Sequence, residues 1–119
     1  MVCLLVLTLA VSAIVYAAEY QCIGERIERN GSTWGYARAS GSDYRIEKGS
    51  STVAFVKQKG GGKWMIEDQG NNTIGWLDGS SIEKVNGSSW ASLSDAKSLC
   101  GGPDPVAAAI WVLNQNGKL

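Results

Sequence analysis

The sequence predicts a mainly β protein: an eight-stranded antiparallel meander, either a small barrel or a strongly twisted sheet, with one or two C-terminal helices. Two observations predict the sheet. A unit of about twenty residues with an Ile-Glu pair occurs four times, which indicates a repeated structural element. Each unit also carries a turn rich in Gly, Asn or Ser after that pair. The helices are predicted because strand-like alternation stops at Pro103 and an apolar helical pattern follows.

The repeated unit has the pattern of a β-hairpin. The four copies are RIERNGSTWGYAR from Arg26, RIEKGSSTVAFVK from Arg45, MIEDQGNNTIGWLD from Met65 and SIEKVNGSSWASL from Ser81. After the turn, each copy has Thr or Ser, then a large apolar residue, then a small residue. Two short runs of this kind around a Gly or Asn turn are typical of a hairpin. The sequence therefore predicts four hairpins across residues 26–93.

Turn positions define the strands and their pairing. The predicted strands are residues 22–29, 32–39, 43–48, 51–58, 63–69, 72–78, 80–85 and 88–93. A two-residue turn at Asn30-Gly31 places Ile27 opposite Trp34. In the third and fourth units the spacing from Ile to the large apolar residue grows from seven to eight. A bulge is therefore expected in those two hairpins, with Gly70 and Gly87 available for it.

This pairing sorts the side chains onto two faces. The face expected to be buried collects Ile27, Trp34, Tyr36, Tyr44, Ile46, Val53, Phe55, Trp64, Ile66, Ile74, Trp76, Ile82 and Trp90. The opposite face shows Glu28, Glu47, Glu67 and Glu83 beside Thr33, Thr52 and Thr73. Small residues follow the large ones at Gly35, Ala54, Gly75 and Ala91. Small residues at these places favour a strongly curved sheet.

The C-terminal region has the signals of a helix. Asp104 is expected as the N-cap, Pro105 as the first helical residue and Gly117 as the residue after the end, which predicts a helix over residues 105–116. Its apolar stripe consists of Val106, Ile110 and Leu113. A shorter helical segment is expected over residues 94–99.

The N-terminal segment is apolar and without charge over residues 1–18. Small residues at Val15 and Ala17 fit the pattern of a signal peptidase site, so residues 1–17 are interpreted as a signal peptide cleaved after Ala17. The alternative is an uncleaved membrane anchor, because no Lys or Arg precedes the apolar run and its length just suffices to cross a bilayer. Residues 18–119 form the single predicted domain.

Two cysteines remain after cleavage, Cys22 and Cys100. An even pair in a small exported domain predicts a disulfide. A metal site is the weaker interpretation, because two thiols without any His give too few soft ligands. The sequence predicts no metal ion and no cofactor.

Charge and composition exclude several functions. The chain has 11 Lys plus Arg, 11 Asp plus Glu and no His. A net charge of zero removes the attraction that nucleic-acid binding relies on, so no nucleic-acid partner is expected. The lack of His excludes Ser-His-Asp and Cys-His catalysis. The repeated Glu residues are interpreted as solvated strand charges. A pair of catalytic carboxyls needs one with a raised pKa in a cleft, and a regular exposed column gives no sign of such a difference. The sequence predicts no catalytic residues and no enzyme.

A binding function remains. Two hairpin tips, residues 38–43 and 57–63, carry the local departures from neutrality, and their charged residues are the candidate binding residues: Arg38, Asp43, Lys57, Lys59 and Lys63. The predicted function is a small, secreted or periplasmic binding module with a protein partner of the cell envelope or exterior. Contact with a membrane is expected only if residues 1–18 persist as an anchor, which would make the chain an accessory subunit. Carbohydrate binding through the repeat aromatics is a further alternative.

A family resemblance supplies a second alternative. A Tyr-X-Cys start at Tyr20-Gln21-Cys22, a single disulfide and the stretch Ser40-Gly41-Ser42-Asp43-Tyr44 resemble the periplasmic lysozyme inhibitors, which are small exported eight-stranded barrels. The Ile-Glu repeat and the C-terminal helix are not features of that family. The resemblance implies inhibition of a hydrolase such as lysozyme.

Overall fold

A computed structural model describes residues 20–119 as one antiparallel sheet with two C-terminal helices. The predicted signal peptide and its cleavage site after Ala17 lie outside the described residues. The sheet has nine strands in the order in which they follow along the chain, so it is a meander as predicted. No helix within residues 20–119 is both long enough and apolar enough to cross a bilayer.

The strands number nine rather than eight because the predicted first strand is divided. The strands are β1 (Tyr20–Ile23), β2 (Arg26–Arg29), β3 (Ser32–Ser40), β4 (Asp43–Lys48), β5 (Ser51–Gly60), β6 (Lys63–Asp68), β7 (Thr73–Asp78), β8 (Ser81–Glu83) and β9 (Ser89–Ser92). The helices are α2 (Leu93–Leu99) and α3 (Asp104–Gln115). Gly24 has a φ of 60° and turns the chain between β1 and β2. This left-handed conformation suits Gly, so the expected strand over residues 22–29 becomes a tight hairpin.

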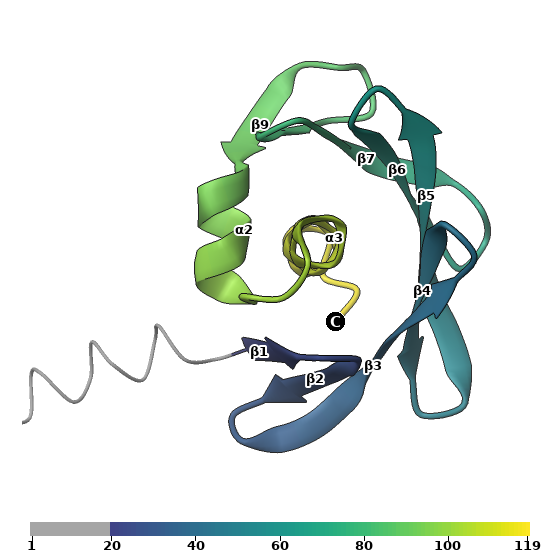
Figure 1. The fold of residues 1–119 in the computed structure, drawn as a ribbon, viewed down its shortest axis with the longest axis vertical. Coiled ribbons are helices and arrows are strands. Elements are labelled where there is room, and N and C mark those ends of the chain that lie inside the picture. Colours follow the sequence, from purple (N-terminus) through teal and green to yellow (C-terminus); the bar gives the residue numbers. More distant parts are fainter. Residues whose placement is uncertain (1–19) are drawn as a thin grey trace, which may run out of the picture.

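The sheet curls around α3, which is seen end-on at the centre of Figure 1. It does not close, because β1 and β9 are not paired with each other. Helix α2 stands in the gap between these two edge strands (Figure 1). Of the two forms that the sequence allows, the protein therefore adopts the open, strongly curved sheet.

Every repeat contains a β-bulge opposite the Ile-Glu pair, on the second strand of its hairpin. Ile27 pairs with Gly35 whereas the next residue, Glu28, pairs with Thr33, so Trp34 is the extra residue of the first hairpin. The same one-residue shift occurs between β4 and β5, β6 and β7, and β8 and β9, where the extra residues are Val53, Ile74 and Trp90. The sequence predicted bulges only in the last two units. The predicted pairing of Ile27 with Trp34 is therefore wrong by one residue.

This bulge changes the faces, since a shift of one residue moves the following side chains to the other side of the sheet. The inner face holds Ile27, Ala37, Ile46, Ala54, Val56, Ile66, Leu77 and Ile82, all at most 4% exposed. Tyr36, Phe55 and Trp76 were expected on this face, but they pair with Glu47, Glu67 and Glu83 on the outer face. Small inner residues thus replace large ones, and the space they leave admits a helix.

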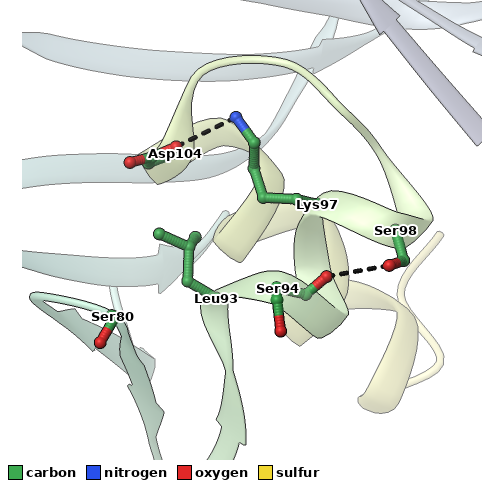
Figure 2. A pocket seen from close by; sticks show the side chains of 6 residues that line it. All are labelled: Ser80, Leu93, Ser94, Lys97, Ser98 and Asp104. Carbon is green, nitrogen blue, oxygen red and sulfur yellow. Dashed lines mark hydrogen bonds and ion pairs between the residues drawn. The ribbon is translucent and has the colours of Figure 1, made fainter.

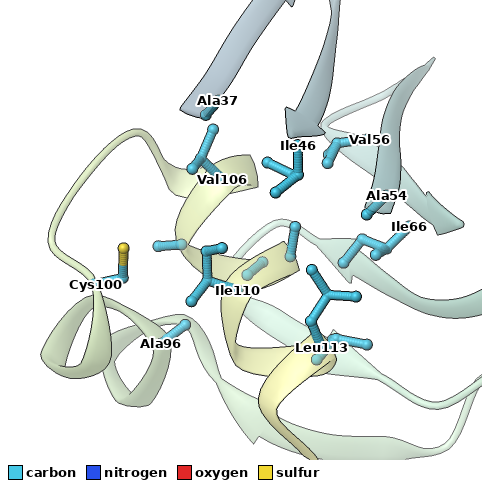
Figure 3. Packing of buried hydrophobic residues seen from close by; sticks show 14 of the residues in the cluster. Ala37, Ile46, Ala54, Val56, Ile66, Ala96, Cys100, Val106, Ile110 and Leu113 are labelled. Atoms are coloured by element: carbon cyan, nitrogen blue, oxygen red, sulfur yellow. The ribbon is translucent and has the colours of Figure 1, made fainter. Parts of the chain in front are cut away.

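Helix α3 fills that space. Val106, Ile110 and Leu113 are at most 1% exposed, as the predicted stripe requires, and Ala107, Ala108 and Ala109 are also fully buried. Val106, Ile110 and Leu113 share one buried cluster with Ala37, Ile46, Ala54 and Ile66 of the sheet, and Figure 3 shows Val106 on the side of Ala37 and Ile110 on the side of Ala96 in α2. A helix that is apolar all round must be buried on all sides. The curled sheet and α2 provide that environment.

The two helices begin differently, because α2 has a side-chain cap and α3 has none. α3 begins at Asp104 with Pro103 as the N-cap, one residue earlier than predicted. At its other end Gly117 has a φ of 66°, and the backbone N–H of Lys118 donates to Leu113 at 2.9 Å, which satisfies a terminal carbonyl. α2 begins with a capping box in which Ser92 and Asp95 exchange hydrogen bonds.

The predicted disulfide joins Cys22 in β1 to Cys100 after α2. The two Cα atoms are 5.2 Å apart and the sequence separation is 78 residues. On the chain-entropy description, closing a loop of that size stabilises the fold by about 4 kcal/mol. The bond also fixes β1 next to the helical pair, and so holds the open side of the sheet together.

Candidate functional site

The residues predicted to bind a partner lie toward one end of the sheet. The turns at residues 41–42, 61–62 and 79–80 are at that end, which we call the tip end. Asp43 Oδ1 accepts a hydrogen bond from the backbone N–H of Gln58 at 2.9 Å, which joins the first turn to the second hairpin. The backbone N–H of Gly79 donates to the carbonyl of Gly62 at 3.2 Å, which joins the second turn to the third. The three tips are thus one connected surface.

Three outer-face aromatic rings each carry a cation. The pairs are Arg38 with Tyr36, Lys57 with Phe55 and Lys63 with Trp76, at 4.6, 5.8 and 4.6 Å from the ring centroids. This is the geometry of a cation–π contact. Cations of the chain itself therefore lie over these rings, where a stacked sugar would need access.

Two of the candidate cations are also neutralised by carboxylates. Arg38 Nε lies 2.8 Å from Glu47 Oε1, and Arg45 Nε lies 2.7 Å from Glu47 Oε2. The hydrogen bond from Arg38, followed by that from Arg45, lowers the pKa of the Glu47 carboxyl below its ordinary value. The same hydrogen bond raises the pKa of Arg38. Lys57 Nζ is 2.8 Å from Glu67 Oε1. Arg38 and Lys57 thus stabilise the outer face of the sheet.

Lys59 and Lys63 differ from these two. Within residues 20–119, neither has a carboxylate within ion-pair distance. Lys59 is exposed beside the turn, and Lys63 starts the next strand directly after it. The tip end therefore presents two lysines that have no ion-pair partner among residues 20–119.

Glu67 is not the solvated strand charge that the sequence suggested. Its side chain is only 8% exposed. Its Oε1 lies 2.8 Å from the Nζ of Lys57 and accepts a hydrogen bond from the Nδ2 of Asn71 at 3.4 Å. On the outer face of the sheet, Lys57 from β5 and Asn71 from the loop after β6 cover the carboxylate. The contacts are those of a structural ion pair. Elsewhere among residues 20–119, no group of three or more His, Cys, Asp or Glu is placed to hold a metal ion.

A groove of 530 Å³ lies at the tip end between α2 and the start of α3 (Figure 2). It is lined by Ser80, Leu93, Ser94, Lys97, Ser98 and Asp104. Lys97 Nζ donates to Asp104 Oδ1 at 3.0 Å and also to the Gly102 carbonyl, while Ser98 Oγ donates to the Ser94 carbonyl at 3.0 Å. A serine nucleophile needs a general base within hydrogen-bond distance of its hydroxyl. Lys97 instead bonds to Asp104 and Gly102, and the Ser98 hydroxyl bonds to a backbone carbonyl. Lys97 serves to join α2 to α3.

A second groove, of 430 Å³, opens at the opposite end of the sheet, beside the C-terminal end of α3. Its lining residues are Ile74, Lys84, Val85, Asn86, Trp90 and Asn116. We call it the mouth groove. Sequence reasoning missed both grooves because their residues come from segments that only the curled fold brings together. The one signal available for the mouth groove was Val85, an apolar residue within a polar turn.

Comparison with known proteins gives no relative: no family model, no curated protein and no solved structure matches this chain.

Proposed function

We propose that this chain is a small exported binding module without enzymatic activity, and that it binds a protein of the cell envelope or exterior through its tip end. The observation that carries the proposal is the connected tip surface with two lysines, Lys59 and Lys63, that have no ion-pair partner among the described residues. Rigid scaffolds that present loops are a common basis for binding. The hydrogen bond from Gln58 to Asp43 supplies the rigidity here.

Export is supported by two features. The disulfide between Cys22 and Cys100 is of the kind that persists in oxidising compartments. The apolar segment before Glu19, with small residues at Val15 and Ala17, is typical of a secretory leader. The proposed location is therefore the periplasm or the cell exterior.

The chemistry of the tip end favours an acidic partner surface. Lys59 and Lys63 flank three consecutive glycines, Gly60 to Gly62, which have no side chains to keep a partner at a distance. All three have positive φ values, between 61° and 83°. Surface cations of this kind act mostly on association rate and on salt dependence. The complex should therefore weaken as salt concentration rises.

The test is a pull-down with the disulfide-bonded domain from the envelope and secreted fractions of its host. Replacing Lys59 and Lys63 together with Glu should abolish capture of the partner. Lys48→Glu is the matched control, because Lys48 is an exposed lysine at the opposite end of the sheet, and it should leave capture unchanged. Loss of capture in both variants, or in neither, contradicts the proposed surface.

The identity of the captured partner separates the alternatives. A captured hydrolase whose activity falls on binding selects inhibition, the function implied by the resemblance to lysozyme inhibitors. A captured glycan selects carbohydrate binding. Turnover of any substrate that a single Asp or Glu replacement abolishes would overturn the non-enzymatic proposal.

A further inference from the structure

The mouth groove has the size and lining of a ligand site. Its volume of 430 Å³ falls within the range of about 300–1,000 Å³ that is usual for small-ligand pockets. Its walls come from β7, the β8–β9 turn, β9 and the residue after α3. The mouths of curled sheets and barrels are common places for such sites.

Comparison among the repeats singles out Val85. The turn after the Ile-Glu pair is polar or Gly in the first three units, which read Arg-Asn-Gly-Ser, Lys-Gly-Ser-Ser and Asp-Gln-Gly-Asn-Asn. The fourth unit reads Lys-Val-Asn-Gly-Ser, and its Val85 is 59% exposed. Folding of a hairpin does not require an apolar residue at this place, as the other three copies show. Val85 is thus an exposed apolar side chain that the hairpin itself does not need, and it lies at the edge of the mouth groove.

Trp90 occupies the bulge of the last repeat and forms a second apolar wall. In the first repeat, the equivalent Trp34 is covered by Lys48 from the following hairpin, at 5.5 Å from the ring centroid. No hairpin follows Trp90, and its ring instead contacts Trp111 in a T-shaped pair at 5.2 Å. Ile74, the bulge residue of the third repeat, lines the same groove.

The polar groups of the mouth groove retain unused hydrogen-bonding capacity. Lys84 has no carboxylate within ion-pair distance in residues 20–119, and the lining contains no acidic residue. Asn86 Oδ1 accepts from Ser88 at 3.0 and 2.7 Å, which leaves its Nδ2 as a donor. Asn116 Nδ2 donates to Val112 at 2.9 Å, which leaves its Oδ1 as an acceptor. The groove thus offers a cation, an amide donor and an amide acceptor beside apolar walls.

We propose that the mouth groove binds the C-terminal residue of a polypeptide that ends in an apolar side chain. The apolar side chain would lie against Ile74, Val85 and Trp90. The α-carboxylate would be held by Lys84 and by the Nδ2 of Asn86, since hydrogen bonds in which one partner is ionised are stronger than neutral ones. The backbone N–H of the terminal residue would donate to Asn116 Oδ1. A free fatty acid lacks that donor, and this favours the peptide over it.

The experiment measures peptide binding by the full disulfide-bonded protein. The probe is acetyl-Ala-Ala-Leu with a free carboxylate, and its matched control is the same peptide as the C-terminal amide. Titrations followed by amide and indole NMR should show saturable binding of the carboxylate, with a Kd on the order of 0.1–1 mM. The amide should bind about tenfold more weakly because it loses the charge-assisted contact.

Two variants locate the site. Lys84→Gln should weaken binding of the carboxylate peptide about tenfold while leaving the amide unaffected. Val85→Ser gives the fourth turn the polar character of the other three, so it should fold normally and weaken both peptides. Lys59→Gln at the tip end is the control and should change neither, which also keeps this test separate from that of the tip-end function.

Several outcomes would overturn the proposal. They are equal affinity for the carboxylate and the amide, binding of octanoate as tight as that of the peptide, unchanged affinity in Lys84→Gln and Val85→Ser, or no shift of the Trp90 indole at about 5 mM peptide. Folding of each variant is checked by its NMR spectrum before titration.

Discussion

Gly102 packs against Cys22 so closely that a Cβ added to Gly102 would lie 2.5 Å from the Cβ of Cys22. The contact is between the segment that leads into α3 and the disulfide that ties down β1. No flexible side-chain end is available there to move aside, because the Cβ atom of a cystine is held by both its backbone and the bond.

Gly102→Ala should therefore destabilise the protein, by about 1–3 kcal/mol, which is typical of overpacking. Gly101→Ala is the matched control, since its added Cβ would meet only ordinary contact at 3.7 Å. Chemical denaturation of both variants checks this expectation. Equal stabilities would show that the segment before α3 adapts freely.

Glu67→Gln should lower the free energy of unfolding by about 1–2 kcal/mol, because it removes the charge that Lys57 pairs with at 2.8 Å. Glu83→Gln tests the same position of the next repeat, where residues 20–119 provide no cation within ion-pair distance. Its effect should be close to zero. A larger effect at Glu83 than at Glu67 would contradict the assigned role of the pair.

The face assignment can be tested by placing one carboxylate on each side of the sheet. Ile66→Asp should prevent folding, because Ile66 is 0% exposed and faces α3, so that an unpaired charge would be buried. Trp76→Asp should be tolerated better, since Trp76 is on the outer face beside Glu83 and only partly buried. Circular dichroism of the two variants decides the matter, and equal loss of structure would refute the register.

Acid should weaken the fold through Glu47. Its pKa is lowered in the folded protein by the hydrogen bonds from Arg38 and Arg45. A carboxyl with a depressed folded pKa stabilises the native state above its unfolded pKa, and this contribution is lost as pH falls from the ordinary Glu value of 4.5 through the folded pKa. Stability measured against pH should therefore decline in that window. The decline should be shallower in Glu47→Gln, and identical slopes would contradict the expectation.

Titration of thiols checks the covalent link. Protein of residues 18–119, unfolded and unreduced, should show no reactive thiol, since Cys22 and Cys100 are bonded to each other. Reduction should then lower the free energy of unfolding by about 4 kcal/mol. Two free thiols would contradict the bond.

Much of the fold follows from the repeat. The Ile residues, Ile27, Ile46, Ile66 and Ile82, were placed on the inner face and are buried there. The turns at Asn30-Gly31 and Gly49-Ser50 join the strands that were expected. These features depend on local turn chemistry and on alternation, which a sequence displays directly.

The face was predicted wrongly for Tyr36, Phe55 and Trp76, which follow the bulge on the second strand of the first three repeats. In the first two units the bulge adds one residue without leaving a distinct local signal. Large aromatic residues such as Tyr36 and Phe55 then appeared to be the natural core. Their true place became clear only with α3, whose own bulk fills the interior. Whether a helix docks outside or inside a curled sheet depends on tertiary packing.

The candidate surface was predicted in part. The turns near Asp43 and Lys59 were correctly expected as hairpin tips, because charge and turn residues are visible in the sequence. The pairing of Arg38 with Glu47 across neighbouring strands was not foreseen. It depends on register, and register in turn depends on the bulges.

The position of α3 has a consequence for how the chain acquires its structure. The helix follows every strand in the sequence, yet it supplies much of the buried core and packs against the central strands β5, β6 and β7. During synthesis or translocation from the N-terminal end, the nine strands emerge before their common interior does. Until residues 104–115 arrive, the strands would expose their apolar side to chaperones, proteases and one another. The sheet therefore becomes stable only when α3 has been made. A chain that ends before Asp104 should be degraded rather than persist as a smaller sheet.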